Sequence, residues 1–100
     1  MEIKFKIKRF NELSTVELYF LLQLRSEVFV VEQNCVYQDI DGKDEKALHV
    51  LGYYNNDLAA YSRLFNKGYY FEETSIGRVV VSPKYRDKKI GHDLMRVSIE

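Results

Sequence analysis

Apolar and basic residues alternate at the start of the chain. Ile3, Phe5 and Ile7 fall on one side of an extended segment, and lysines occupy the positions between them. A period of two is typical of a β-strand with one buried face. A row of lysines on the other face is typical of a strand at the edge of a sheet. We therefore predict a half-buried edge strand over residues 3–8, with its lysine face exposed to water.

The next pattern has the period of a helix. Ser14 and Glu17 have the three-residue spacing of a capping box, and Leu13 and Leu18 flank it as a hydrophobic staple. Apolar residues then cover more than half of the helix circumference, which predicts broad contact with a sheet. We predict a helix that runs from Ser14 to about Glu32.

Three later runs, residues 47–54, 58–65 and 76–81, have the composition of β-strands. Asn55-Asn56-Asp57 joins the first two runs with residues that tolerate positive φ, which predicts a tight turn. These strands are expected to form an antiparallel meander. From Ile90, apolar residues at helical spacing predict a final helix. The element order is β-α-β-β-β-α, an α+β (mixed α/β) architecture in one domain.

The composition excludes several classes of function. Lysine plus arginine and aspartate plus glutamate total 15 each, so the chain has no net positive field to bind nucleic acid. The longest apolar stretch, residues 16–31, is interrupted by charged and polar residues, which argues against a membrane span. Cys35 is the single cysteine and has no accompanying zinc ligands. We predict a soluble cytoplasmic protein without a metal, in which the Cys35 thiol is buried or half-buried.

Acidic residues gather between positions 35 and 46. Asp39, Asp41 and Asp44 surround Gly42, an arrangement that shares features with a calcium loop. The spacing of such a loop is not kept, because no glutamate stands at its twelfth position. We therefore favour a solvated acidic loop over a calcium site.

The basic turn after the 76–81 strand predicts an anion site. Pro83 interrupts the strand pattern, and Arg86, Lys88 and Lys89 follow shortly before Gly91 and the predicted helix. N–H groups in the first turn of a helix have no partner within it, and the helix dipole adds positive potential there. A diphosphate is therefore a natural ligand. The turn lacks the Gly-Lys-Ser/Thr ending of a P-loop, which argues against that class of nucleotide site.

Two stretches of the sequence resemble a known family. Val79-Val-Val-Ser-Pro-Lys-Tyr-Arg86-Asp-Lys-Lys89-Ile-Gly91 resembles the central motif of the GNAT superfamily of N-acetyltransferases, a valine-rich strand followed by Arg/Gln-x-x-Gly-x-Gly/Ala. Lys89 stands where the first glycine is usual. Residues 21–35 and 37–44 are similar to the ElaA-like subgroup. The resemblance implies a GNAT-like acyl-CoA N-acyltransferase fold, of which residues 1–100 would be a single domain containing the N-terminal two thirds.

The resemblance also implies a function and a ligand. The protein would use acetyl-CoA as co-substrate and transfer the acetyl group directly to a primary amine of an acceptor that the sequence does not name. The pantetheine would pair with the main chain of Val79, Val80 and Val81, and the Val81 amide or a neighbouring one would stabilise the oxyanion. The pyrophosphate would bind the turn, which assigns Arg86, Asp87, Lys88, Lys89, Ile90, Gly91 and His92.

The general base is left open by the sequence. The candidates are Glu73, His49, Glu27 and the Asp39/Asp41 pair. His49 lies between apolar residues of a predicted strand, which favours a half-buried, hydrogen-bonded imidazole over a base. Arg25 and Glu27 fit a surface ion pair and the lining of an amine pocket equally well.

Two further expectations concern the whole molecule. A non-catalytic module that binds CoA or a partner through a degenerate GNAT fold is the alternative function, because the chain ends within the predicted last helix and shows no obvious base. In such a chain the 76–81 strand keeps an exposed apolar edge, which predicts a homodimer formed through that edge.

Overall fold

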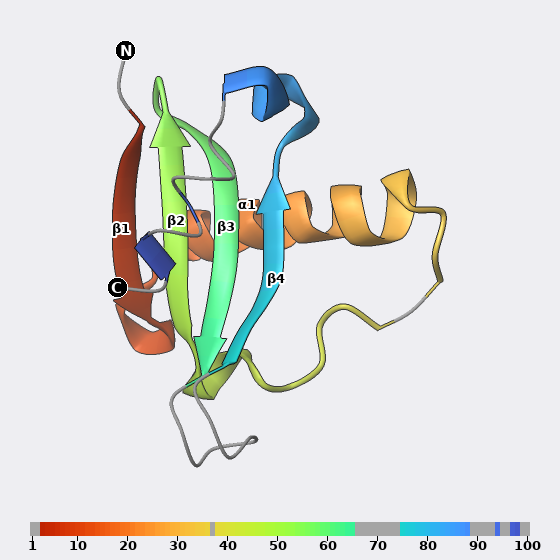
Figure 1. The fold of residues 1–100 in the computed structure, drawn as a ribbon. Helices are drawn as coiled ribbons and strands as arrows, with labels where there is room; N and C mark the ends of the chain where they lie inside the picture. Colours follow the sequence, from red (N-terminus) through yellow and green to blue (C-terminus); the bar gives the residue numbers. More distant parts are fainter. Residues whose placement is uncertain (1–2, 37, 66–74, 89–93, 95–96, 99–100) are drawn as a thin grey trace.

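The structure is a computed structural model that describes residues 3–36, 38–65, 75–88, 94 and 97–98. Four strands form one antiparallel sheet in the order β1-β2-β3-β4, so each strand pairs with its neighbours in the sequence (Figure 1). The strands are β1 (Lys4–Arg9), β2 (Leu48–Tyr54), β3 (Asp57–Phe65) and β4 (Ser75–Val81). The predicted antiparallel meander is therefore confirmed, and β1 is an edge strand as expected.

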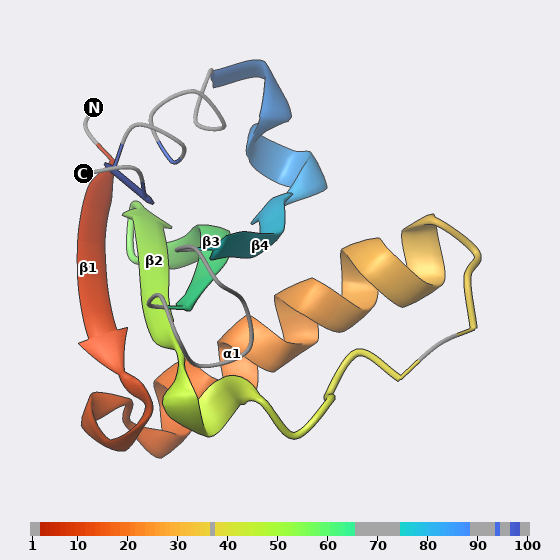
Figure 2. The ribbon, with the colours of Figure 1, turned by 60° about the horizontal axis from the view of Figure 1, so that its bottom comes forward.

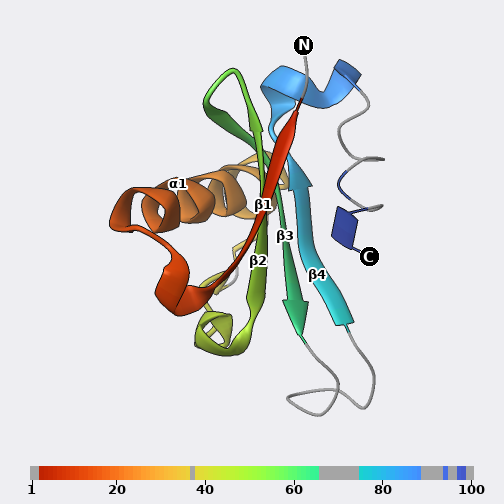
Figure 3. The ribbon, with the colours of Figure 1, turned by 90° about the vertical axis from the view of Figure 1, so that its left-hand side faces the viewer.

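Helix α1 (Thr15–Arg25) covers one face of the sheet, and the described residues near the C-terminus cover the other (Figure 3). The helix begins where the sequence predicts. The Ser14 hydroxyl accepts from the Glu17 N–H at 3.0 Å, and the Glu17 carboxylate accepts from the Ser14 N–H at 2.9 Å. The same carboxylate accepts from Lys8 Nζ at 2.8 Å. Lys8 of β1 is thus half-buried beside α1, whereas Lys4 and Lys6 on the same face are exposed to water, as predicted for this strand.

The helical path continues to Glu32, as predicted, but its last part is wider than an α-helix. Residues Ser26–Glu32 form a π-helix, and the Gln33 N–H donates to the Val28 carbonyl oxygen, five residues earlier, at 3.2 Å. Asn34 then has a φ of 51°, a left-handed conformation that ends the helix. Figures 1 and 2 show that α1 and the π-helix cross the strands and extend past β4.

Apolar side chains fill both faces of the sheet. The face beneath α1 holds a cluster made of Leu21, Leu24, Val28, Leu51, Tyr61 and Val80. The opposite face holds a second cluster made of Val50, Ala59, Ala60, Leu64 and Leu94, with Val97 packed against it. Leu94 and Val97 are helical, as the predicted final helix requires, and residues 89–93, 95–96 and 99–100 lie outside the described residues.

The hairpin between β2 and β3 has the predicted turn. Asn55 and Asn56 have φ values of 53° and 70°. Positive φ at both central residues is the requirement of a two-residue type I′ turn, which matches the twist of the flanking strands. Asp57, predicted as the last turn residue, already belongs to β3.

Two carboxylates of the acidic loop are buried, contrary to the prediction of a solvated loop, although most of the other described residues of the loop are exposed. Asp39 and Asp44 are each 7% exposed, and the loop includes a 3-10 turn over Asp44–Lys46. The physical reason is that arginines from three other elements bind these carboxylates. The prediction for Cys35 was also wrong, because its thiol is exposed.

Candidate functional site

Strand β4 has one edge that no other strand of the described sheet covers. The Ser82 N–H donates to a carbonyl oxygen of β3 at 2.7 Å, and Val80 pairs with β3 in the ladder. Main-chain groups alternate along a strand, so those of Val81 point away from β3. The contact of Arg86 Nε with the Val81 carbonyl oxygen at 3.2 Å agrees with this direction. The same alternation directs the main chain of Val79 toward the open edge.

A groove runs beside this edge. It is lined by Val28, Phe29 and Gln33 from the π-helix region and by Val79, Val80, Val81 and Arg86. Val79 is 38% exposed, so apolar surface is accessible there. The groove combines an apolar wall, outward main-chain groups and one guanidinium. It can therefore hold an extended molecule that carries both amide groups and an anionic group.

Arg86 is the cationic residue of the groove, and a carboxylate already binds it. Its guanidinium donates to the two carboxylate oxygens of Glu32 at 2.9 and 2.6 Å. The side chains are 45% and 39% exposed, so the pair lies at the surface. The hydrogen bond from Arg86 lowers the pKa of Glu32, and the same contact raises the pKa of Arg86. An anion that binds Arg86 must compete with Glu32.

The rest of the predicted anion site is only partly described. Residues Pro83–Lys88 form a 3-10 turn that includes Asp87 and Lys88. Lys89, Ile90, Gly91 and His92 lie outside the described residues. The structure thus places Arg86 beside Val81, and the anion site itself stays a prediction.

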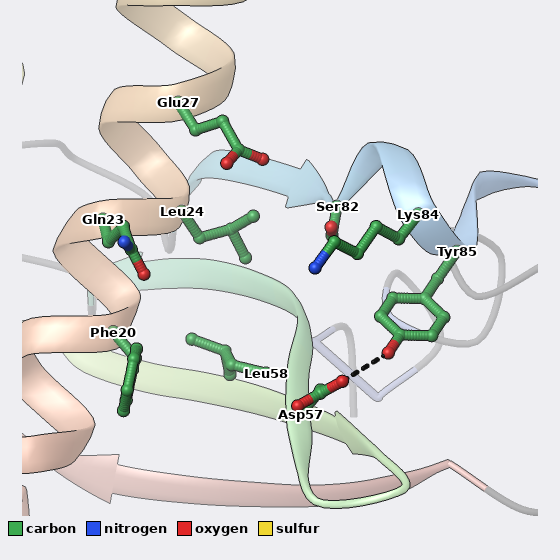
Figure 4. A pocket seen from close by; sticks show the side chains of 9 residues that line it. All are labelled: Phe20, Gln23, Leu24, Glu27, Asp57, Leu58, Ser82, Lys84 and Tyr85. Atoms are coloured by element: carbon green, nitrogen blue, oxygen red, sulfur yellow. Dashed lines mark hydrogen bonds between the residues drawn. The ribbon is translucent and has the colours of Figure 1, made fainter.

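A second cleft opens between α1 and the 3-10 turn (Figure 4). It has a volume of about 210 Å³ and is lined by Phe20, Gln23, Leu24, Glu27, Asp57, Leu58, Ser82, Lys84 and Tyr85. The Tyr85 hydroxyl donates to Asp57 Oδ2 at 2.6 Å and ties the turn to the β2–β3 hairpin. Sequence reasoning missed this pair, because its members are 28 positions apart and belong to no motif.

The candidate bases lie in different places. Glu27 is exposed at the second cleft, and Glu73 lies outside the described residues. His49 is 0% exposed, more buried than predicted. Its Nε2–H donates to the Asp44 carbonyl oxygen at 2.9 Å, and its Nδ1 accepts from the Tyr61 hydroxyl at 2.5 Å. Both ring nitrogens of His49 are thus engaged in the interior, which favours the structural interpretation of this residue.

We expect His49 to make the protein less stable in mild acid. Burial lowers the pKa of His49 below its ordinary value of 6.5, because the ring would have to gain charge away from water. The unfolded chain then binds a proton at a higher pH than the folded chain does. The stability contributed by the neutral ring is fully present above pH 6.5, and the free energy of unfolding falls as the pH drops below that value.

Urea denaturation of the wild type and of His49→Gln, between about pH 7.5 and pH 5, measures this effect. Glutamine keeps an acceptor and a donor but does not titrate. The loss of stability in acid should therefore be smaller in the variant than in the wild type. The same pH dependence in both proteins would contradict the expectation.

Arg25 lies in the interior, in an arginine–aspartate network formed by Arg25, Arg63, Arg78, Asp39, Asp41 and Asp44. Its Nε donates to Asp39 at 3.0 Å, and its Nη1 donates to Asp44 at 2.8 Å. The side chain is 0% exposed. Neither role considered for Arg25, a surface ion pair or the lining of an amine pocket, is correct, because buried carboxylates from the acidic loop bind it.

The other two arginines complete the network. Arg63 Nη1 donates to Asp41 at 2.9 Å and to Asp44 at 3.0 Å, and Arg78 Nε donates to Asp39 at 2.8 Å. Although burial opposes it, the hydrogen bond from Arg63 lowers the pKa of Asp41 to about 2. The Asp39/Asp41 carboxylates are therefore bound to arginines, which argues against their use as a base.

The described part of the chain contains neither a group of metal ligands nor a membrane-spanning helix. No group of three or more His, Cys, Asp or Glu side chains there is arranged to hold a metal ion. No helix among the same residues is long and apolar enough to cross a membrane.

The fold and the β4 edge define the class of protein. The sequence profile of the Acetyltransferase (GNAT) family matches residues 15–100. The chain belongs to this family, and the expected GNAT acyl-CoA N-acyltransferase fold is confirmed.

Within the family the chain is ElaA-like. It is 50% identical over 92 residues to Protein ElaA of Escherichia coli, a match that covers 90% of this chain and 60% of that protein. The crystal structure of E. coli ElaA has a TM-score of 0.91 at 46% identity and covers 98% of this chain. An acyl-CoA N-acyltransferase from Pseudomonas aeruginosa has a TM-score of 0.92 at 40% identity. The chain covers 68% of each of these two structures.

One more distant structure shares the fold. A predicted acetyltransferase from Clostridium acetobutylicum, whose crystal structure includes acetyl-CoA, has a TM-score of 0.63 at 13% identity. At this identity the likeness concerns the fold alone.

Proposed function

We propose that this chain carries the acetyl-CoA-binding part of an N-acetyltransferase that acts on a primary amine. The observation that carries the proposal is the open edge of β4, where the main chain of Val81 faces outward beside Arg86. An extended arm with amide groups can pair with such an edge as an added strand does. A diphosphate at the end of the arm would meet the guanidinium of Arg86. Family membership and the acyl-CoA N-acyltransferase from P. aeruginosa support this class of donor and chemistry.

The reaction would be a direct transfer. The neutral amine attacks the thioester carbonyl, a C–N bond forms, the C–S bond breaks, and CoA leaves as a thiolate that takes up a proton. The ammonium must first lose a proton to a base. An outward amide of Val79 or Val81 is suited to donate to the carbonyl oxygen as negative charge develops on it. Binding the amine and the thioester side by side at the edge of β4 would also favour the reaction through proximity.

Among the candidate bases, the proposal retains Glu27. It lies on the second cleft near Ser82, which directly follows β4. Figure 4 shows its carboxylate directed toward this cleft. An acceptor amine that enters the cleft would meet a carboxylate close to the end of the strand. Glu27→Gln should therefore reduce turnover and leave the affinity for acetyl-CoA unchanged.

The proposal is tested by calorimetric titration with acetyl-CoA and by CoA release across a panel of amines. Both are measured on this chain and on the full-length protein, because the chain spans 60% of the length of E. coli ElaA. We expect affinity in the micromolar range, about −8 kcal/mol, and amine-dependent release of CoA. Affinity without release would favour the non-catalytic module. Equally strong competition by ATP would indicate a general diphosphate site, and no binding by either folded form would overturn the proposal.

A further inference from the structure

One residue of β4 has a backbone conformation that is unusual for its type. Arg78 has a φ of 51°, in the left-handed region that residues with a Cβ adopt at a cost in free energy. The β3–β4 register shifts by one residue at the same place, so Arg78 and Val79 of β4 together face Ser62 of β3. This extra residue is a β-bulge.

The Arg78 side chain is anchored in the loop between the π-helix and β2. Its Nε donates to Asp39 Oδ1 at 2.8 Å, and its Nη2 donates to the Asp39 carbonyl oxygen at 3.1 Å. Asp39 is itself fixed from the other side. Arg25 of α1 donates to its carboxylate at 3.0 Å and to its carbonyl oxygen at 2.9 Å. Asp39, which holds the Arg78 side chain, is thus bound to α1 through the fully buried guanidinium of Arg25.

The strand opposite the bulge binds the same loop. Arg63 of β3 donates to both oxygens of Asp41 at 2.9 Å. Arg78 Nη2 reaches one of these oxygens at 3.3 Å. The two strands at the bulge are therefore held by one short acidic segment, and the bulge cannot be removed without breaking these contacts.

The bulge decides which main-chain groups face the open edge of β4. Without the bulge, the pairing of residues 79–81 with β3 would shift by one residue. The main-chain groups of Val79 and Val81 would then face β3, and those of Val80 would face the groove. The Val80 side chain, 2% exposed in the cluster beneath α1, would leave that cluster.

We propose that Arg78 is a positioning residue: held by Asp39 and Asp41, it maintains the β4 bulge and so directs the amides of Val79 and Val81 toward an acyl thioester. This inference rests on the proposed function. Arg78 is not among the described residues that line the groove, so it acts through the backbone of the residues that follow it.

Two substitutions separate positioning from direct contact with the ligand. Arg78→Ala and Arg78→Gly both remove the guanidinium, but glycine alone adopts positive φ without a steric penalty. We expect Arg78→Ala to weaken acetyl-CoA binding about tenfold, which corresponds to ~1.4 kcal/mol. Arg78→Gly should stay within about threefold of the wild type. Calorimetry is done at a temperature where thermal denaturation shows each variant to be folded. The fitted stoichiometry is a second check, because a partial loss of folded protein lowers the stoichiometry and leaves the affinity unchanged.

Amide hydrogen exchange of residues 79–81, followed by NMR, is a second readout that needs no ligand. The wild type and Arg78→Gly should share a pattern in which the Val80 amide exchanges more slowly than its neighbours, and Arg78→Ala should lose this pattern. Equal losses in the two variants, or no loss in either, would overturn the inference. If the wild type does not bind acetyl-CoA, the proposed function fails, and the exchange comparison alone decides whether Arg78 maintains the bulge.

Discussion

Replacing Arg25 with leucine is expected to lower the free energy of unfolding by about 3–5 kcal/mol. Arg25 is 0% exposed and donates to Asp39 and Asp44 in the interior. Without the guanidinium, each of two nearly buried carboxylates would lose one of its arginine partners, while the described contacts of Asp44 with Arg63 and of Asp39 with Arg78 would stay. A buried charge that loses its partner retains its desolvation cost, and leucine supplies no hydrogen bond in return.

Arg86→Leu is the matched control for this prediction. Arg86 also donates to the two oxygens of a carboxylate, but its side chain is 45% exposed. Exposed ion pairs contribute about 0–1 kcal/mol, because water solvates the separated charges. Urea denaturation of the wild type and both variants measures the contrast. Equally small losses in the two variants would show that the buried network contributes no more than a surface pair.

Replacing Arg86 with alanine is expected to weaken acetyl-CoA binding by about 10- to 100-fold. Hydrogen bonds to charged groups contribute about 1.5–3 kcal/mol, and each ~1.4 kcal/mol is a factor of ten in affinity. Glu32→Gln should have the opposite effect and strengthen binding by up to about fivefold, because the side chain that competes for Arg86 loses its charge. Calorimetry at low ionic strength shows both effects best, since salt screens exposed charges.

Glu27→Gln is the matched control for Glu32→Gln. The Glu27 carboxylate raises the pKa of Arg86 through space, whereas the described hydrogen bonds of Arg86 go to Glu32 and Val81. Equal gains from Glu27→Gln and Glu32→Gln would mean that net charge, and not the release of Arg86, controls affinity. Wild-type affinity in Arg86→Ala would show that the ligand does not use this guanidinium.

The parts of the fold that the sequence predicts well depend on neighbours in the chain. The capping box of Ser14 and Glu17, the Asn55-Asn56 turn and the alternation of the strands are each settled within a few residues. The burial of Asp39 and Asp44 in the acidic loop was not predicted, because their partners are distant in the sequence. Arg25 and Arg78 lie 14 and 39 positions from the Asp39 carboxylate that they share.

A signal for the arginine–aspartate network was nevertheless present in the sequence. Arg25 interrupts an apolar helix face, and Arg63 and Arg78 lie within apolar strands. Arginines are rarely fully buried unless they are paired, so three of them on faces turned to the core require carboxylates nearby. The acidic loop is the densest source of carboxylates in the chain, and this requirement could have predicted that some of its aspartates are buried.

The proximity of the candidate binding residues was predictable to the extent that they lie within one motif. Val79, Val81 and Arg86 are close in sequence, and the structure brings them together. The contact between Glu32 and Arg86 was missed, because the two residues are 54 positions apart. The apolar pattern of the helix that contains Glu32 also gave no sign of this contact. The second cleft was missed for the same reason, since its walls come from α1, the β2–β3 hairpin and the turn.

Self-association through the open edge of β4 would compete with the proposed binding of a ligand at the same edge. If two copies pair through this edge, the outward groups of Val79 and Val81 bind the other copy and are lost to a thioester arm. Thermodynamic linkage then requires each equilibrium to oppose the other: ligand would dissociate the dimer, and raising the protein concentration would weaken the apparent affinity for ligand. In such a protein the fraction of dimer would fall as the concentration of the ligand rises.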